Sequence, residues 1–326
     1  MKTIRWGIIG VGDVTEVKSG PAFYKAPNSE LVAVMRRSGE KAKDYAERHN
    51  VPKWYDDGDA LINDPDVDVV YIATPQYAHK DYTLKVAAAG KPVYCEKPMA
   101  LSHAECQEMI DACANANVPL WIAYYRRAMP RFLKIKELIN TAIGDVRTVS
   151  IQLSNSTPIQ EHTPTENLPW RYHPELSGGG LFVDVGSHQI DLLNYYFGNI
   201  TEVKGYATNR AGLYPVADTA VASFKFESGI IGSGVWNFAA GTTVDETTIV
   251  GSKGALKFAV FEPTPFTLTT DAGVQTFDLA YPEHVHQPLV ETIIAELLGT
   301  GTCPSTGESA RHTNWFIDEV LKTYHR

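Results

Sequence analysis

The sequence predicts an α/β protein of two domains, in which a doubly wound parallel sheet precedes a domain with an open, mainly antiparallel sheet. Over residues 1–123, short apolar runs alternate with helical patterns, which is typical of βαβ units. Over residues 124–326, longer runs alternate apolar and polar residues between tight turns, which indicates antiparallel strands. The length of 326 residues is sufficient for two hydrophobic cores.

Composition excludes several classes of partner. The formal net charge of -9 argues against nucleic acid, because phosphate binding requires clustered Lys and Arg. The apolar run at residues 6–11 is too short to span a membrane. The 4 cysteines lack the paired spacings of a zinc site, and no signal peptide is recognised. We therefore expect reduced thiols, no metal and a cytoplasmic protein.

The elements of the first domain follow from its apolar periodicity. Pro21 should interrupt the first helix. The predicted strands cover residues 3–9, 31–35, 53–55, 67–73, 92–94 and 118–123, and the predicted helices cover residues 14–25, 39–49, 57–63, 79–89 and 102–115.

The first strand leads into a glycine-rich turn that suits a dinucleotide. Gly10 permits a tight turn, and Gly12 lets the backbone approach a pyrophosphate, which would lie on the amino terminus of the following helix, near Asp13 and Val14. Thr15 stands at the third position of the fingerprint, where glycine is usual. The pattern predicts a Rossmann domain. The residues of this turn that we expect to bind a nicotinamide cofactor are Gly10, Gly12, Asp13 and Val14.

Arg36, Arg37 and Ser38 follow the second strand, where an NAD-selective enzyme would place an acid on the ribose. Because a guanidinium forks onto phosphate, this triplet favours NADP(H) over NAD(H). A solvated strand end is the structural alternative.

Two further turns lie at the carboxyl ends of predicted strands. Thr74 and Pro75 end one strand, and His79, which follows them, either contacts the ligand or shapes the wall of the cleft. Glu96 and Lys97 precede Pro98 after the next strand, so the ammonium is held by a rigid turn at the edge where open α/β sheets bind ligands. The Lys97–Pro98 bond could be cis.

The second domain reads as a sheet with one covered face. Ser228-Gly229 and residues 251–254 are hairpin turns. The other face is either solvated or in contact with a second subunit. Trp236 and Phe238 share one side of their strand, and we interpret them as an aromatic row that favours the second subunit. The predicted strands cover residues 146–154, 202–209, 217–227, 230–239, 243–250 and 255–260, and the helices cover residues 130–141, 181–197, 287–298 and 307–324.

One helix of this domain carries acid and imidazole groups. Asp184, His188 and Asp191 recur at steps of four and three and share a face, so a carboxylate could orient the ring. An amphipathic helix with a buried histidine is the alternative. Before this helix, the loop of residues 155–177 contains Trp170, Arg171 and Tyr172 and is interpreted as a lid or binding loop.

Together these motifs resemble the glucose-fructose oxidoreductase, inositol dehydrogenase and rhizopine catabolism (GFO/IDH/MocA) family of NAD(P)-dependent oxidoreductases. The resemblance covers the glycine turn, Glu96-Lys97-Pro98, Trp170-Arg171, the run from Gly178 to His188, and residues 304–310. It implies a Rossmann domain, a second domain whose open sheet forms the interface of a homodimer or homotetramer, and a sugar, cyclitol or related polyol as the substrate.

The resemblance also implies site residues. Lys97, Asp184 and His188 would handle the proton while hydride moves between the substrate and the nicotinamide, and removal of hydride from a carbinol does require a base. In the oxidative direction we expect His188, oriented by Asp184, to take the proton and Lys97 to hold the same oxygen, and on sequence alone the two roles can be exchanged. The candidate substrate-binding residues are Lys97, Tyr124, Arg126, Trp170, Arg171, Tyr172, Asp184 and His188, and the candidate cofactor-binding residues are Gly10, Gly12, Asp13, Val14, Arg36, Arg37, Ser38, Thr74, Pro75, His79, Glu96 and Lys97.

Two alternatives remain open on sequence alone. A dehydrogenase of the same superfamily could act on a trans-dihydrodiol, which an apolar cleft would favour, or on an imino acid, which paired arginines would favour. A non-catalytic nucleotide-binding sensor would keep the fold without turnover.

Overall fold

The computed structural model describes residues 2–159 and 163–324. The chain divides into two compact units, one formed by Met1–Met129 and Pro282–Arg311, the other by Pro130–Tyr281 and His312–Arg326. The expected division fell between residues 123 and 124 and assigned everything after it to the second domain. The first unit instead includes a segment near the end of the chain.

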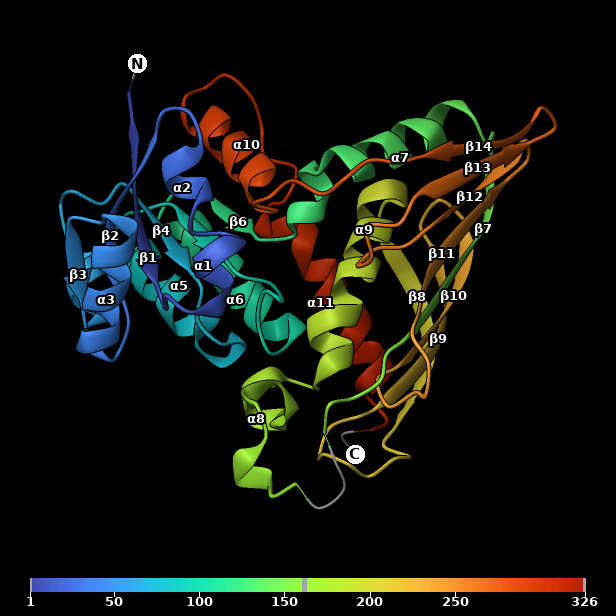
Figure 1. The fold of residues 1–326 in the computed structure, drawn as a ribbon, viewed down its shortest axis with the longest axis horizontal. Helices are drawn as coiled ribbons and strands as arrows, with labels where there is room; N and C mark the ends of the chain where they lie inside the picture. The colour runs from blue at the N-terminus through green and yellow to red at the C-terminus, as the bar shows by residue number, and fades with distance from the viewer. Residues whose placement is uncertain (1, 160–162, 325–326) are drawn as a thin grey trace. The chain divides into compact units, whose positions relative to one another are not determined.

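The first unit contains a six-stranded sheet in the order β3-β2-β1-β4-β5-β6 (Figure 1). All of its neighbouring strands are parallel, as expected of buried runs without alternation. Its strands are β1 (Ile4–Ile9), β2 (Ser29–Met35), β3 (Lys53–Tyr55), β4 (Val69–Ile72), β5 (Val93–Cys95) and β6 (Leu120–Ile122).

Helices cover both faces of this sheet, which makes it doubly wound. Phe23 of α2 and Ile293 of α10 lie in the core of one face, and Val86 of α5 and Met109 of α6 lie in the core of the other. As predicted, the chain breaks at Pro21, between α1 and α2. The helices are α1 (Asp13–Val17), α2 (Ala22–Lys25), α3 (Gly39–His49), α4 (Gly58–Ile62), η1 (Gln76–Ala78), α5 (His79–Ala88), α6 (His103–Asn115), η2 (Tyr125–Ala128) and α10 (Gln287–Leu297).

Hydrogen bonds to β6 explain why the late segment belongs to the first unit. The hydroxyl of Ser305 donates to the carbonyl of Ile122 at 2.6 Å, and the Ile122 amide donates back to the Ser305 carbonyl at 3.0 Å. Arg127 donates to the carbonyl of Pro304 at 2.7 Å and to the hydroxyl of Ser309 at 2.6 Å. These hydrogen bonds to β6 and the residues after it therefore place the late segment in the first unit, although it is distant from that unit along the chain.

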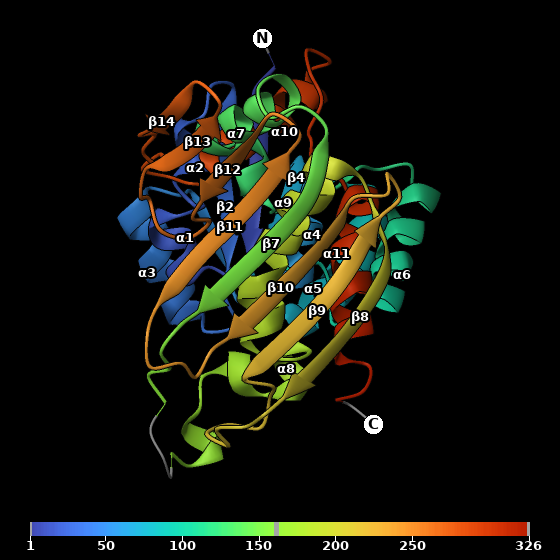
Figure 2. The same ribbon diagram turned by 90° about the vertical axis from the view of Figure 1, so that its right-hand side faces the viewer.

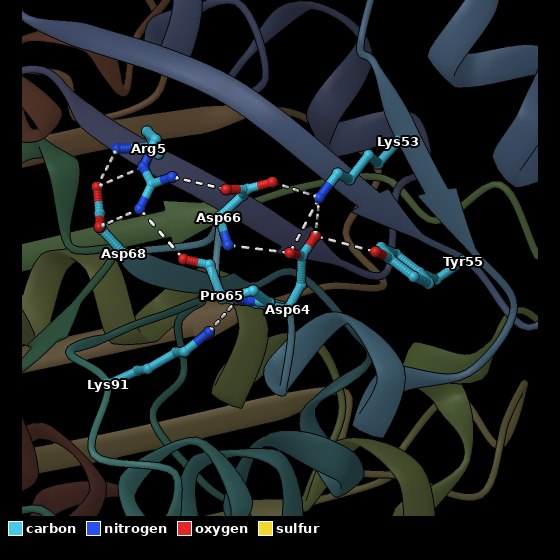
Figure 3. A network of polar contacts seen from close by, with 8 residues as sticks. All are labelled: Arg5, Lys53, Tyr55, Asp64, Pro65, Asp66, Asp68 and Lys91. Atoms are coloured by element: carbon cyan, nitrogen blue, oxygen red, sulfur yellow. Dashed lines mark hydrogen bonds and ion pairs between the residues drawn. The ribbon is translucent and has the colours of Figure 1, made fainter.

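A polar network joins the amino ends of the parallel strands, opposite the edge that carries the candidate site (Figure 3). Asp64 accepts from Lys53 at 3.0 Å and from the Tyr55 hydroxyl at 2.9 Å. Burial raises the pKa of Asp64, but the bonds from the Asp66 amide, Lys53 and Tyr55 outweigh it, so the pKa lies below its usual range. The network connects β3 with the turn before β4.

The second unit contains an eight-stranded sheet in the order β14-β13-β12-β11-β7-β10-β9-β8 (Figure 2). Its pairs are antiparallel except for β7 and β10, which are parallel. Its strands are β7 (Val146–Ser154), β8 (Ile200–Thr208), β9 (Thr219–Phe226), β10 (Ile231–Asn237), β11 (Val244–Gly251), β12 (Gly254–Phe258), β13 (Phe266–Thr270) and β14 (Gly273–Phe277).

Helices of this unit pack on one face of the sheet, and the interpretation of Trp236 and Phe238 as an exposed aromatic row is wrong. Both side chains are 0% exposed. Trp236 packs against the rings of Phe182 and Phe316 and donates to Gln189 at 2.8 Å. Trp236 and Phe238 do share one side of their strand, as the sequence predicts. That side is the covered face of the sheet, where burial of their rings stabilises the unit.

The other face of the sheet carries exposed apolar side chains. Tyr206, Val221 and Val235 stand directly opposite one another on β8, β9 and β10, and their exposures are 75%, 36% and 42%. Ile231 is also exposed. We call Tyr206, Val221, Ile231 and Val235 the apolar stripe.

The helices of the second unit largely match the expected ranges, with two exceptions. The predicted helix of residues 181–197 begins as a π-helical turn, and residues 155–177 contain short helices, although residues 160–162 lie outside the described residues. Helix α11 contains the boundary between the two units. The helices are α7 (Pro130–Thr141), η3 (Thr165–Asn167), η4 (Trp170–Tyr172), α8 (Pro174–Ser177), the π-turn η5 (Phe182–Gly186), α9 (Ser187–Phe197) and α11 (Gly307–Leu321).

Candidate functional site

The glycine turn after β1 has the form that a dinucleotide requires. Gly10 has a φ of +95°, and a Cβ there would lie 2.9 Å from Thr74, so a side chain would be strained at this position. A Cβ on Gly12 would meet nothing closer than 3.9 Å, which leaves room for a ligand beside the backbone. The amides of Asp13 and Val14 open α1, where first-turn donors have no acceptor within the helix.

Thr15 replaces the third glycine by a specific arrangement. Its hydroxyl accepts from the Gly12 amide at 2.9 Å and donates to the Gly12 carbonyl at 2.8 Å. The Tyr45 hydroxyl donates to the Thr15 carbonyl at 2.8 Å. Thr15 therefore stabilises the turn, and a phosphate group fits the donors that remain.

Arg36, Arg37 and Ser38 follow β2 at the same edge of the sheet, where β1 and β2 are parallel neighbours. Arg36 is half-buried, and Arg37 and Ser38 are exposed. Within residues 2–159 and 163–324, neither arginine forms an ion pair. Both guanidinium groups therefore lack a carboxylate partner within the described residues.

His79 is engaged by the backbone on both sides of its ring. Nε2 lies 2.9 Å from the Thr74 carbonyl, and Nδ1 lies 3.0 Å from the Pro98 carbonyl. Burial lowers the pKa of this histidine, although the carbonyls act in the opposite direction. These contacts favour the interpretation that His79 shapes the wall of the cleft rather than contacting the ligand. Its ring joins the turn at Thr74 and Pro75 to the Lys97 turn.

The Lys97 turn follows β5 and is held from several directions. Its peptide bond to Pro98 is cis. The Glu96 amide donates to the Ile72 carbonyl at 2.9 Å, and the Lys97 amide donates to the side chain of Glu96 at 3.1 Å. Gln76 donates to the Ala100 carbonyl. The Lys97 side chain is half-buried, so its ammonium group is presented by a turn with little freedom.

A buried set of four residues, which we call the Glu96 network, lies beneath this turn and was not predicted from the sequence. It consists of Tyr71, Tyr94, Glu96 and His286, all of which are buried. The Tyr71 hydroxyl donates to Glu96 Oε1 at 2.5 Å, and the Tyr94 hydroxyl lies 3.2 Å from His286 Nδ1. The available signal was two tyrosines in buried strands, whose hydroxyls require partners.

In the second unit, Arg171 forms an ion pair with Asp184, with Nε 3.3 Å from Oδ2. Asp184 lies in the π-turn η5, and such turns are frequent at functional sites. Three glycines with positive φ, Gly178, Gly179 and Gly180, lead the chain into this turn. Gly186 packs tightly, because a Cβ there would lie 3.0 Å from Phe182 and 3.4 Å from Trp236.

His188 is buried at the start of α9, and its ring lies 5.9 Å from that of Phe261. Trp170 is half-buried, with the Arg171 guanidinium 5.2 Å from its ring. Tyr172 is buried against Tyr214, with ring centroids 4.7 Å apart. Tyr172 thus has a packing role, whereas the side chains of Arg171 and Asp184 are brought together.

Tyr124 and Arg126 follow β6 in the first unit. Tyr124 is buried in the core that contains Met99 and Ile122, which is the packing role that tyrosines near a domain junction often have. Arg126 donates to the Tyr125 hydroxyl at 3.0 Å. Arg126 therefore remains a candidate for binding substrate, and Tyr124 is better explained by packing.

Residues 2–159 and 163–324 contain no group of three or more His, Cys, Asp or Glu side chains that could hold a metal ion. In the same part of the chain, no helix is both long and apolar enough to cross a membrane.

Comparison with known proteins places the chain in a family. Residues 4–124 match the family described as "Oxidoreductase family, NAD-binding Rossmann fold", and residues 132–257 match the GFO/IDH/MocA C-terminal domain. The chain therefore belongs to the GFO/IDH/MocA family and is an oxidoreductase with an NAD-binding Rossmann domain.

Individual relatives agree with this assignment. The chain is 40% identical to Oxidoreductase P35 of Formosa agariphila over 323 residues, which cover 98% of this chain and 99% of that protein. It is 29% identical to the trans-1,2-dihydrobenzene-1,2-diol dehydrogenase of Xenopus laevis, over 87% of this chain and 83% of the relative. The crystal structure of aldose-aldose oxidoreductase from Caulobacter crescentus, complexed with glycerol, has the same fold, with a TM-score of 0.88, 24% identity and coverage of 100% and 99%.

Proposed function

We propose that the protein is a dehydrogenase that moves a hydride between NADP(H) and a carbon of a sugar, cyclitol or related polyol, or of its keto form. The observation that carries this proposal is the Lys97 turn, which follows β5 at the edge where the glycine turn follows β1. Parallel sheets bind ligands at this edge, where the strand order reverses. The aldose-aldose oxidoreductase with the same fold supports a sugar-like substrate.

The residues of each unit suit distinct tasks in this reaction. A bound nicotinamide supplies or accepts the hydride. When a carbinol is oxidised, its hydroxyl proton requires a base, and the developing alkoxide requires a nearby cation. In our proposal His188, oriented by Asp184, takes the proton, and Lys97 stabilises the oxygen. Arg171 fixes the Asp184 carboxylate through their ion pair.

An absorbance assay with the purified protein tests the proposal. Sugars, cyclitols, other polyols and dihydrodiols are supplied with NADP or NAD, and formation of the reduced nicotinamide is followed. We expect turnover of at least one sugar or polyol. Binding of the cofactor without turnover of any substrate would support a nucleotide-binding sensor instead.

The second candidate is a dehydrogenase of trans-dihydrodiols. The curated relative from Xenopus laevis, which carries that name, aligns with 87% of this chain. In the assay, turnover of dihydrodiols alone would favour this candidate. Both candidates require the same cofactor site and the same proton chemistry.

Preference for NADP(H) is the first specific prediction. Replacing Arg37 with aspartate should weaken NADP binding by roughly ten- to a hundredfold, because a hydrogen bond to a charged group contributes about 1.5–3 kcal/mol. Binding of NAD should be retained or improved. Dissociation constants for both cofactors, measured by fluorescence titration, provide the test.

Arg147→Asp is the matched control, because it makes the same change of charge on an exposed residue of the second unit. It should leave both dissociation constants unchanged. Equal affinity of the wild-type protein for NADP and NAD would contradict the preference.

We also propose that the protein forms a homodimer or homotetramer through the apolar stripe. We place it in the cytoplasm, a reducing compartment that suits its four free cysteines. The apolar stripe, rather than the aromatic row, is now the reason to expect an oligomer, because exposed apolar rows across long strands favour association. Placing a lysine in the stripe should therefore dissociate the oligomer.

Val235→Lys should convert the protein to a monomer in light scattering at micromolar concentration. Gln152→Lys is the control, because Gln152 stands beside Val235 on β7 and is exposed without being apolar. A wild-type protein that is already monomeric would refute this part of the proposal.

A further inference from the structure

The Glu96 network has no counterpart in the proton chemistry described above. We propose that His286 is a positioning residue for Lys97 and that it acts through the carboxylate of Glu96. This inference rests on the proposed function, because it assumes that Lys97 takes part in the reaction.

The two oxygens of Glu96 connect the network to the Lys97 turn. Oε1 accepts from the Tyr71 hydroxyl at 2.5 Å, and Oε2 accepts from the Lys97 amide at 3.1 Å. A carboxylate is planar, so rotation of one oxygen moves the other. Whatever holds Oε1 in place therefore also determines where the Lys97 amide is held.

His286 provides the second support for Oε1. Its Nε2 lies 3.6 Å from Oε1, and its Nδ1 lies 3.2 Å from the Tyr94 hydroxyl. Since the carboxylate only accepts and the tyrosine can donate, the ring proton belongs on Nε2. The distance of 3.6 Å is too long for a good hydrogen bond, so the contact is an electrostatic attraction across a buried gap.

His286 is also held by contacts that do not involve Glu96. The His286 amide donates to the Lys18 carbonyl at 3.2 Å, and the ring packs on that of Tyr125 at 4.4 Å. His284 further attaches this segment to the first unit, because its Nδ1 lies 2.7 Å from the Val17 carbonyl. The ring is thus a fixed support against which the carboxylate can be oriented.

His286 is suited to positioning rather than to proton transfer. Burial is the main cause that lowers its pKa, to about 3, and the positive charges of Lys97, Lys18 and Arg126 act in the same direction. The ring is only 1% exposed, and burial penalises the charged form. A neutral ring cannot supply protons in the ordinary pH range, yet it still presents an N–H to Glu96.

Displacement of a reacting group by about 1 Å can lower a rate roughly a hundredfold, so loss of this support should appear in kcat. His286→Phe keeps a ring against Tyr125 but removes both nitrogens, and it should lower kcat about tenfold or more. His286→Gln keeps a donor toward Glu96 and should retain kcat within about threefold. Neither variant should change the dissociation constant for NADP(H) by more than about twofold.

A second variant separates positioning from simple packing. Tyr71→Phe removes the hydroxyl that donates to Oε1 and should also lower kcat. Because both residues act on one carboxylate, the loss in the double variant Tyr71→Phe/His286→Phe should be smaller than the product of the single losses. Tyr55→Phe is the control, because its hydroxyl binds Asp64 at the opposite edge of the sheet, and its kcat should match that of the wild type.

Nitrogen NMR of the imidazole rings tests the network without relying on activity. The signal missing from His286→Gln identifies His286 in the wild-type protein. From about pH 5 to about pH 8, that ring should stay neutral with its proton on Nε2. If no substrate is turned over, the proposed function fails, whereas this spectrum still decides whether the network exists.

Four results would overturn the inference. The ring could carry its proton on Nδ1 or could titrate within that range. His286→Phe could retain the kcat of the wild type. Alternatively, His286→Gln could lose as much kcat as His286→Phe, with a matching fall in melting temperature in both variants, which would show that His286 has a packing role only.

Discussion

Replacing Lys97 with methionine is expected to lower kcat by about a hundredfold or more, the usual contribution of one proton-transfer or electrostatic group. Methionine keeps much of the length of the side chain but removes its charge. Binding of NADP(H) should change by no more than a few fold, because the glycine turn and Arg36–Arg37 supply most of the contacts that we assign to it. Steady-state kinetics and cofactor titration together provide the measurement.

Lys91→Met is the matched control for this variant. Lys91 is a partly buried lysine at the opposite end of the same strand, where its ammonium donates to the Asp64 carbonyl at 2.6 Å. Its replacement can affect stability but should leave kcat unchanged. Near-normal turnover by Lys97→Met would show that Lys97 is only a structural residue of the turn.

Replacing His188 with asparagine is expected to lower kcat to a similar extent, by roughly a hundredfold. If His188 is the base, the acidic limb of the pH profile of oxidation should also disappear, because asparagine does not titrate. Asp184→Asn should lower kcat as well but preserve that limb, since the base itself remains. Profiles of kcat between acidic and alkaline pH distinguish the two variants.

His49→Asn provides the control for this pair, because His49 stacks on Tyr45 in the first unit and contacts Glu16. Its profile should follow that of the wild-type protein. A full acidic limb in His188→Asn would show that another group is the base and would exchange the roles of His188 and Lys97.

Local patterns predicted most of the fold. The helix Gly39–His49 and the strand Val146–Ser154 have the expected bounds, because their periodicity and the residues that end them point to the same structure. Strands β13 and β14 were missed. Nearly all of Gly273–Phe277 is exposed, so this edge strand lacks the alternation of buried and exposed residues that identifies a strand.

The candidate site was predictable only where it follows from chain order. The turns at Gly10, Thr74 and Lys97 follow successive neighbouring strands, and parallel pairing alone brings them to one edge. The π-turn at Asp184 and its ion pair with Arg171 depend on glycine conformations and on a loop whose path the sequence does not encode locally.

The Glu96 network shows a further reason for incomplete prediction. Glu96 and His286 are 190 residues apart in the numbering, and their contact arises only because the segment that contains His286 returns to the first unit. Apolar periodicity identifies neither partner. A buried carboxylate beside a site lysine is therefore visible only once the strands are paired.

Transfer of deuterium is the most direct test of the central claim that the protein moves a hydride between NADP(H) and its substrate. NADPH that carries deuterium at the transferable position of the nicotinamide, in each of its two stereochemical forms, is supplied with the keto form of the best substrate. Mass spectrometry of the product should show deuterium bound to carbon with one form of NADPH and none with the other. Product without deuterium from either form would contradict direct hydride transfer and with it the proposed function.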